Sequence, residues 1–195
     1  PLHKNDVPAA DEFMVGQVRA AGANLFCKTN TPEFGAGSNT RNPVWGATGN
    51  PFDPMKTAGG SSGGSAAALA CDMMPIATGS DTGGSLRNPA AWCGVVGFRT
   101  TPGTVPNNKP PFGWSPLSVQ GPMGRTVEDT ALLLAAQVGH DPLHRSGTRR
   151  VLRVISGGCG TVGGGHQARS GQAKPGAVDH AAGRPRAAGC VERDY

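Results

Sequence analysis

Two stretches of the chain carry apolar residues at helical spacing. Residues 8–22 form the first stretch, and Gly22 can supply its C-terminal cap. The second begins at Thr126, which forms a T-x-x-D capping box with Asp129. The expected apolar faces are Met14, Val18, Ala21 and Leu25 in the first helix, and Val127, Ala131, Leu134 and Val138 in the second. The pattern therefore predicts one helix in each stretch.

Between these helices the pattern predicts short strands, one short helix and two long connections. Short apolar runs typical of strands occupy residues 24–29, 75–81 and 93–98. Helix formers return at Ser65, in the run SAAALACDM. Residues 30–60 and 100–124 are dense in Gly and Pro, which predicts irregular connections, and loops of that length are usually functional or disordered. Helices alternating with strands indicate an α/β fold.

Glycine and charge are spread unevenly along the chain. Of 195 residues, 31 are Gly and 17 are Pro, and the formal net charge is +5. Residues 1–146 hold ten basic and ten acidic residues, whereas residues 147–195 hold eight basic and three acidic ones. The last 49 residues also contain 11 Gly and only seven Val, Leu or Ile, too few for a packed core. We expect a folded domain over 1–146, and over 147–195 a Gly/Arg-rich tail that is disordered or translated out of frame.

Composition excludes several classes of protein. The neutral charge balance of residues 1–146 gives no basic surface, so we expect no nucleic-acid partner. Five cysteines without C-x-x-C spacing argue against a disulfide framework and a zinc site, and favour buried thiols in the cytoplasm. The five histidines show no metal-binding spacing, and no apolar run is long enough to cross a membrane. The sequence therefore predicts a soluble cytoplasmic protein with no metal and no cofactor.

Two glycine-serine clusters carry the candidate chemistry. GSDTGGSLR at residues 79–87 can place successive backbone N–H groups around an oxyanion, beside Ser85 as a nucleophile. The oxyanion-binding residues would be Thr82, Gly83, Gly84 and Ser85. GGSSGG at residues 59–64 places Ser61 just before a helix N-terminus, where it could relay a proton. The alternative interpretation is that both clusters are flexible turns.

The segment from Gly59 to Ala90 resembles the signature of the amidase signature family of serine hydrolases. Supporting motifs occur on both sides of it in family order: CKTNTPEFG at residues 27–35, then CGVVGFRTTPG, GPMGRTVEDTALLL and GHDP. The resemblance covers about residues 6–142. It implies an α/β amidase signature fold, a mixed β-sheet flanked by helices, of which the chain holds a part that is incomplete at both ends.

The resemblance also implies a chemistry, namely hydrolysis of a C–N amide bond in a small-molecule amide without metal or cofactor. By position, Ser85 matches the nucleophile and Ser61 the bridging serine, held by a cis peptide bond, of a Ser–Ser–Lys triad. Thr82, Gly83, Gly84 and Ser85 match the oxyanion-binding backbone. Asp81 and Arg87 match polar residues beside the nucleophile, and we assign them to supporting its loop, because a buried arginine needs a carboxylate partner.

The chain departs from the family pattern in three ways, of which the first is the tail after about residue 147, which resembles nothing in the family. The family's catalytic lysine lies upstream of the K-T-N-x-P-E-F segment, so we expect this chain to lack the lysine and to be inactive alone. Lys28 belongs to the later segment, Lys56 stands where the family commonly has an arginine, and Lys4 lies near the end of the chain, so none of them is assigned as the base. Cys27 stands where glycine is usual, and we expect it to pack as a small buried residue.

Three functions follow from the resemblance. The first is a general amidase. The second is the amidase (A) subunit of a tRNA-dependent glutamyl or aspartyl amidotransferase, a partner-bound protein that takes ammonia from glutamine. That protein typically reads like YGL-x-A-x-ASSLDQ where this chain has FGWSPLSVQGPMGR at residues 112–125, which favours the first. The third is a non-catalytic truncated product.

Overall fold

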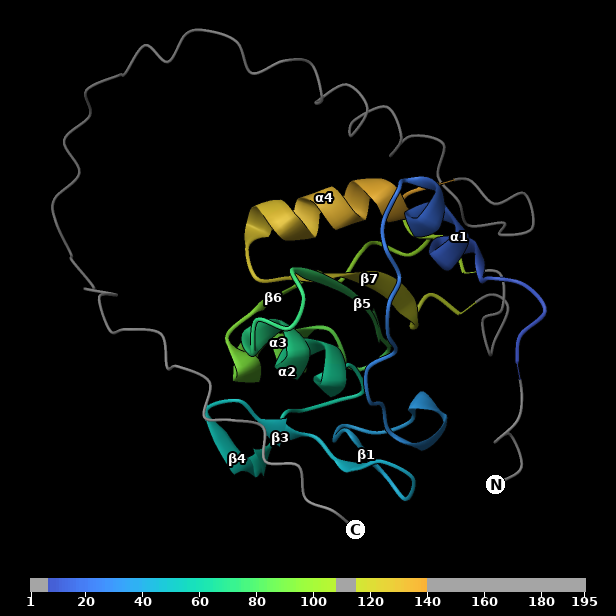
Figure 1. Ribbon diagram of the computed structural model, residues 1–195. Helices are drawn as coiled ribbons and strands as arrows, with labels where there is room; N and C mark the ends of the chain where they lie inside the picture. Colours follow the sequence, from blue (N-terminus) through green and yellow to red (C-terminus); the bar gives the residue numbers. More distant parts are fainter. Residues whose placement is uncertain (1–6, 108–114, 140–195) are drawn as a thin grey trace, which may run out of the picture.

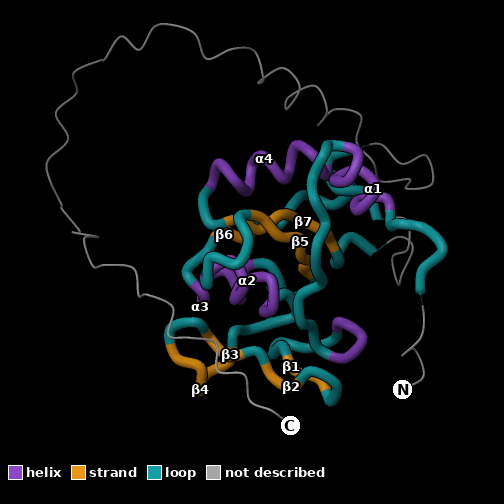
Figure 2. Tube along the Cα trace, viewed as in Figure 1, coloured by secondary structure: helices purple, strands orange, loops and turns teal. Residues whose placement is uncertain are grey.

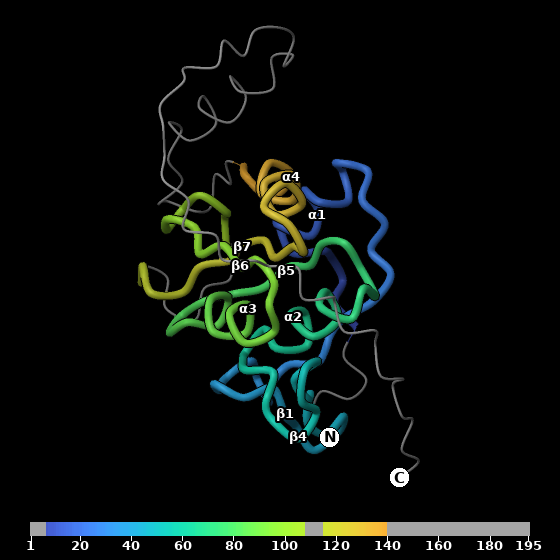
Figure 3. The backbone as a smooth tube through the Cα atoms, turned by 90° about the vertical axis from the view of Figure 1, so that its left-hand side faces the viewer, coloured from blue at the N-terminus to red at the C-terminus, as the bar shows by residue number. Residues whose placement is uncertain are grey.

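The computed structural model describes residues 7–107 and 115–139 of the chain. A three-stranded antiparallel sheet in the order β5-β7-β6 lies between two pairs of helices (Figures 1 and 3). Helices α1 and α4 lie on one side of it, and α2 and α3 on the other, with two small strand pairs beyond them. The elements are α1 (Phe13–Ala20), the 3-10 turn η1 (Glu33–Gly35), β1 (Arg41–Asn42), β2 (Gly46–Ala47), β3 (Gly49–Asn50), β4 (Asp53–Thr57), α2 (Gly63–Ala70), β5 (Ile76–Asp81), α3 (Arg87–Cys93), β6 (Val96–Gly97), β7 (Val119–Gly124) and α4 (Val127–Gln137). The expected α/β class is confirmed.

The middle strand of the sheet is β7, in a segment where an irregular connection was expected. The sequence VQGPMG hides this strand because Gly and Pro normally weaken strands. Gly121 is required by packing, since a Cβ there would overlap the Phe98 carbonyl and lie 2.9 Å from the Leu86 side chain. The neighbouring strand β5 follows the expected run at residues 75–81, and its six residues pair with β7 in register.

The expected strand over residues 93–98 is wrong for most of its length. Cys93 ends helix α3, and Gly94 at φ 67° terminates the helix in the left-handed conformation that glycine tolerates. Only Val96 and Gly97 pair with β7. Helix α3, which begins at Arg87, was not expected because its sequence RNPAAWC has no helical periodicity and contains a proline.

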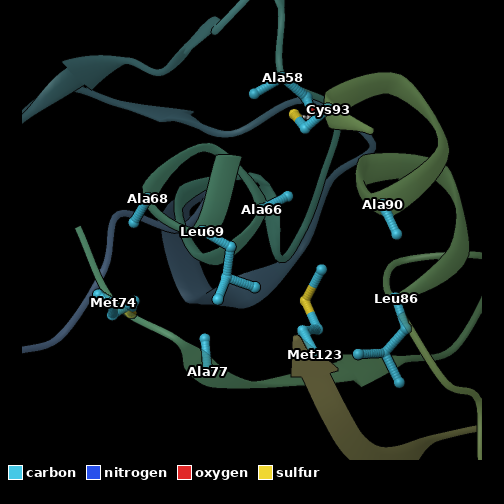
Figure 4. Packing of buried hydrophobic residues seen from close by; sticks show 10 residues of the cluster. All are labelled: Ala58, Ala66, Ala68, Leu69, Met74, Ala77, Leu86, Ala90, Cys93 and Met123. Atoms are coloured by element: carbon cyan, nitrogen blue, oxygen red, sulfur yellow. Dashed lines mark hydrogen bonds between the residues drawn. The ribbon is translucent and has the colours of Figure 1, made fainter. Parts of the chain in front are cut away.

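The main core lies between the sheet and helices α2 and α3 (Figure 4). Helix α2 begins at Gly63, close to the expected start at Ser65. In Figure 4, Leu69 of α2 points toward Ala77 of β5, and Met123 of β7 points into the space between α2 and α3. The buried cluster consists of Ala58, Ala66, Ala68, Leu69, Met74, Ala77, Leu86, Ala90, Cys93 and Met123. Small alanines let both helices approach the sheet closely.

Helix α4 has the expected cap but a different buried face. The Thr126 hydroxyl accepts the Asp129 N–H at 3.1 Å, as the capping box predicts. Within the helix the buried side chains are Thr130, Leu133 and Gln137. Of the four residues expected to face inward, Val127 and Ala131 are exposed, whereas Leu134 is partly buried and Val138 is buried. Gly124 at the end of β7 explains why the helix turns its Thr130 side inward. The two residues are in close contact, because a Cβ on Gly124 would lie 2.7 Å from the Thr130 hydroxyl. The close strand–helix junction thus presses the Thr130 face onto the sheet.

Helix α1 packs beside α4, and a second small core lies between them. Met14 and Val18 are buried as expected and join Val105 and Leu133 in this core. The helix begins at Phe13, later than expected, and Gly22 at φ 89° follows its end. Ala21 and Leu25, also expected on the apolar face, are exposed because the helix has ended before them.

The segment after α1 contradicts two expectations. Residues 24–29 form no strand, since none of the strands in the described part of the chain pairs with them. Cys27 is exposed rather than buried, whereas Cys93 is buried and its pKa is raised to about 11, mainly by burial and also by Cys71. The high pKa keeps the Cys93 thiol protonated and unreactive.

The expected irregular segment 30–60 contains two strand pairs. Strand β1 pairs with β2, and β3 with β4, both antiparallel (Figure 2). They are too short to be seen as alternating patterns in the sequence. The expected tail over 147–195 lies outside the described residues. None of the helices in the described part of the chain is long and apolar enough to cross a membrane.

The packing of α2 on the sheet gives a first prediction. Leu69→Ala removes a fully buried side chain between α2 and β5, and it should lower the free energy of unfolding by about 3 kcal/mol, measured by urea denaturation. Leu132→Ala on the exposed face of α4 is the matched control and should change it by less than about 0.5 kcal/mol. Equal losses in the two variants would contradict this core.

Candidate active site

Residues 59–62 of the GGSSGG segment form a buried loop between β4 and α2, and the last two glycines begin α2. Ser61 is only 7% exposed, and the peptide bond between Gly60 and Ser61 is cis, as the resemblance implies. The loop has no room for side chains at its glycines. A Cβ on Gly59 would lie 3.1 Å from the Pro89 backbone, and one on Gly60 would lie 2.9 Å from the backbone of residues 38–39. The cluster is therefore a packed loop and not an exposed flexible turn.

Thr40 holds this loop from the side of the small strand pairs. Its N–H donates to the Gly59 carbonyl at 2.9 Å. Its hydroxyl donates to the Ser61 carbonyl at 3.4 Å and accepts the Gly63 N–H at 3.0 Å. These contacts lie on both sides of Ser61. No sequence pattern assigned a role to Thr40, because it lies about twenty residues away from the loop and in a segment expected to be irregular.

The K-T-N part of CKTNTPEFG packs against the start of α2. The Thr29 hydroxyl lies 2.9 Å from that of Ser65, and a Cβ on Gly64 would overlap the Asn30 backbone. The Asn30 amide donates to the Thr48 hydroxyl at 3.0 Å, and its oxygen accepts from the Asn42 amide at 2.6 Å. Sequence reasoning had noted this segment only for its resemblance. The structure shows that it ties the strand pairs to the first serine loop.

Ser62 joins the two glycine-serine clusters. Its hydroxyl accepts the Ser80 N–H at 3.2 Å and donates to the Ser80 carbonyl at 3.3 Å. Ser80 lies on β5, one residue before Asp81 ends the strand, and Ser85 follows in the loop between β5 and α3. Ser85 is half-buried. The first loop is therefore bonded to the strand that leads into the second, although 18 residues separate Ser62 from Ser80.

The fully buried carboxylate of Asp81 organises the second loop. Arg87 donates to it through Nε at 2.9 Å and Nη2 at 3.1 Å, which is a bidentate pair. The backbone N–H groups of Gly84 and Leu86 donate to it at 2.8 and 3.2 Å. The turn that carries Ser85 is thus wrapped around one carboxylate. This geometry fits the support role proposed for Asp81 and Arg87 from the sequence, although the Arg87 side chain is 54% exposed and the buried partner is Asp81.

Arg99 is a further partner of Asp81 that sequence reasoning missed. It donates to the Asp81 carboxylate at 2.8 Å and to the Asp81 carbonyl through Nη1, and to the Leu117 carbonyl at 3.0 Å through Nη2. It therefore links the end of β5 to the residues just before β7. Arg99 lies in CGVVGFRTTPG, one of the segments that carry the family resemblance. A basic residue in that segment was the sequence signal that could have indicated a partner for Asp81.

One of the four N–H groups expected to bind an oxyanion is engaged within the protein. The Gly84 N–H, one of the four expected donors, is bonded to Asp81 instead. No hydrogen bond among the described residues engages the N–H groups of Thr82, Gly83 or Ser85. Gly84 has φ 122°, and a Cβ there would lie 2.7 Å from the Asn88 side chain, so only glycine fits. Three of the four N–H groups are therefore available to an oxyanion.

The electrostatics of the site favour an ionised Asp81. Burial alone would raise the pKa of its carboxyl, but the hydrogen bonds from Arg87, Gly84 and Leu86, together with the charge of Arg87, lower that pKa to about 2. The same hydrogen bond and charge raise the pKa of Arg87. Asp81 is consequently a permanent anion at neutral pH, suited to holding a loop and not to exchanging protons.

The lysines of the described residues face solvent. The Lys56 side chain is 77% exposed, and its ammonium group lies 3.2 Å from the carboxylate of Asp53. Lys28 is exposed as well. A lysine that accepts a proton from a serine is usually desolvated in its site, whereas both of these lysines face solvent. Lys4 lies outside the described residues. Among the residues that the structure describes, no group of three His, Cys, Asp or Glu side chains could hold a metal ion.

A family model described as Amidase matches residues 1–154 of the chain. The chain belongs to the amidase signature family. The glutamyl-tRNA(Gln) amidotransferase A-subunit of Thermus thermophilus is 51% identical to it over 146 residues, which cover 73% of this chain and 30% of that protein. The chain thus spans less than a third of the length of the curated relatives it matches.

Solved structures of the family share this arrangement of helices and strands. A bacterial aryl acylamidase of the amidase signature family superposes with a TM-score of 0.70 at 35% identity, over 75% of this chain and 30% of that one. The glutamyl-tRNA(Gln) amidotransferase A-subunit from Thermotoga maritima superposes with a TM-score of 0.66 at 37% identity, over 74% of this chain and 32% of that one. The amidase signature fold inferred from the sequence is confirmed.

The low pKa of Asp81 predicts how this amidase signature domain responds to acid. The unfolded carboxyl has a pKa near 3.8 and the folded one about 2, so the unfolded chain binds the proton more readily. The ionised group therefore stabilises the fold by about 2 kcal/mol above pH 4, and this contribution disappears as the pH falls from about 4 to about 2. In Asp81→Asn the loss of stability over that window should shrink, as measured by urea denaturation at each pH. An unchanged pH profile would contradict the assignment.

The bidentate pair gives a separate prediction. Arg87→Lys keeps the positive charge but loses the fork that engages both carboxylate oxygens. The folded pKa of Asp81 should then rise toward the unfolded value, so the acid-induced loss of stability should be smaller and should be complete at a higher pH. Arg19→Lys is the control, because Arg19 bonds the exposed Asp11 through one nitrogen only. Identical acid profiles for the two variants would show that the fork is not needed.

Proposed function

We propose that the domain contributes the serine centre of an enzyme that cleaves amide C–N bonds, with Ser85 as nucleophile and Ser61 as proton relay. The observation that carries this proposal is the pair of hydrogen bonds between Ser62 and Ser80. They hold the buried Ser61 loop against the strand that leads into the Ser85 loop. Membership of the amidase signature family supports the same chemistry.

The available N–H groups indicate how the substrate would be held. The carbonyl oxygen of the amide would accept hydrogen bonds from the N–H groups of Thr82, Gly83 and Ser85, which stabilise the negative charge that develops on it. Asp81 would not contact the substrate but would fix the turn on which these N–H groups lie. The site would therefore be preorganised before the substrate arrives.

The proposed proton path follows from the resemblance. The Ser85 oxygen attacks the carbonyl carbon, its proton moves to the Ser61 oxygen, and the proton of Ser61 moves to a neutral lysine. The protons return by the same path to the leaving nitrogen as the C–N bond breaks, and water then releases the acyl group from Ser85. Lys28 and Lys56 are exposed, so the proposal takes this base from a lysine outside the described residues.

Two functions within the family remain as proposals. The segment at residues 112–125 departs from the amidotransferase pattern and favours a hydrolase of simple amides. The 51% identity to a glutamyl-tRNA(Gln) amidotransferase subunit favours the second function, in which glutamine is the amide and other subunits are partners. A substrate pair separates them: 4-nitroacetanilide for the first, and glutamine with detection of released ammonia for the second. We also propose that the protein is cytoplasmic, whichever of the two functions it has.

Covalent labelling tests the nucleophile. A fluorophosphonate should modify the chain at Ser85, as located by mass spectrometry of peptides, and Ser85→Ala should abolish the modification. Ser61→Ala should slow labelling, by up to about 100-fold when the lysine is supplied on the upstream segment of a relative, without changing the labelled residue. Ser38→Ala, an exposed serine outside both loops, is the control and should label normally. Labelling that persists in Ser85→Ala would overturn the proposal.

A further inference from the structure

The hydroxyl group of Thr40 is enclosed by the loop that carries Ser61. Thr40 is 1% exposed, and its hydroxyl both donates to the Ser61 carbonyl and accepts the Gly63 N–H. A Cβ on Gly63 would overlap this hydroxyl, so the glycine leaves the space that the oxygen occupies. Both hydrogen-bonding roles of one buried hydroxyl are therefore directed at the backbone from Ser61 to Gly63.

The backbone of Thr40 is itself fixed by the small strand pairs. Its N–H donates to the Gly59 carbonyl at 2.9 Å, and its carbonyl accepts the Thr48 N–H at 2.9 Å. The Thr48 carbonyl in turn accepts the Ala58 N–H at 3.3 Å. Residues 40, 48 and 58 thus form a hydrogen-bonded chain that returns to the serine loop. The backbone of Thr40 is therefore held by hydrogen bonds while its hydroxyl contacts the Ser61 carbonyl.

We infer that Thr40 is a positioning residue for the relay serine: its hydroxyl sets the orientation in which Ser61 takes the proton from Ser85. This inference rests on the proposed function and adds a residue to it. Thr40 touches neither the substrate nor the reacting atoms, and it acts only through the Ser61 backbone. Removing the hydroxyl while keeping the shape of the side chain should therefore impair the relay and leave the nucleophile in place.

The test compares threonine variants by the rate of fluorophosphonate labelling at Ser85, with the lysine supplied on the upstream segment of a relative, as in the test of Ser61→Ala. Thr40→Val has nearly the same shape without the hydroxyl, and it should label about five- to tenfold more slowly. Thr40→Ser restores the hydroxyl and should label within about twofold of the wild-type rate. Thr130→Val is the matched control, because Thr130 is also buried and donates to a backbone carbonyl, at 2.8 Å, but on α4. It should lower the melting temperature without slowing labelling.

A double variant separates positioning from general damage. If Thr40 acts through Ser61, Thr40→Val should not slow labelling further in a Ser61→Ala background. Additive slowing in the double variant, or a wild-type rate in Thr40→Val, would overturn the inference. If Thr40→Val does not fold, Thr40→Ser decides alone: slow labelling of that folded variant would show that the methyl group matters and not the hydroxyl.

Failure of the proposed function gives a different result. In that case the wild-type chain would be labelled no faster than Ser85→Ala, and the inference would fall with the function it rests on. When only the role of Thr40 is wrong, the wild-type chain is labelled at Ser85 and Ser61→Ala is slowed, but Thr40→Val is not.

Discussion

The arrangement of the site depends on one buried charge. The Asp81 carboxylate has no exposed surface, and a charge in that position is tolerated only when donors surround it. Arg87, Arg99 and two backbone N–H groups meet this requirement. They come from the turn after β5, the start of α3 and the residues just after β6. Satisfying one carboxylate therefore fixes the relative positions of three segments, and with them the turn that carries Ser85.

Glycine serves this structure through close packing more than through flexibility. The Ser62 hydroxyl and the Leu86 side chain would each lie 2.7 Å from a Cβ on Gly79, so a side chain there would separate the two serine loops. The Asn30 backbone similarly lies against Gly64. The glycine-rich composition that suggested flexible turns is, in these two loops, a requirement for bringing backbones together.

The described residues share their fold with proteins of different names. The aryl acylamidase and the amidotransferase subunit both superpose on this part of the chain, at TM-scores of 0.70 and 0.66. Membership of the family, and not the fold alone, therefore indicates the class of bond that its members attack, whereas the choice of amide depends on the groups that surround the bond. Under the proposed function, the loops around Ser61 and Ser85 would account for the class of bond.

The sequence by itself determined the family, the strand β5, the helices α1, α2 and α4, and the residues of both serine clusters, because these follow from local periodicity and from motifs contiguous in the chain. Tertiary structure alone decided that VQGPMG is the central strand, that α4 buries Thr130 and not Val127, and that Cys27 is exposed. It also decided that Gly84 donates to Asp81, and that Thr40 and Arg99 hold the two loops. These features arise between residues distant in sequence or from close approach at a glycine, where the side chain that would reveal the contact is missing. Local pattern cannot report a hydrogen bond whose two partners are brought together only when the whole domain packs.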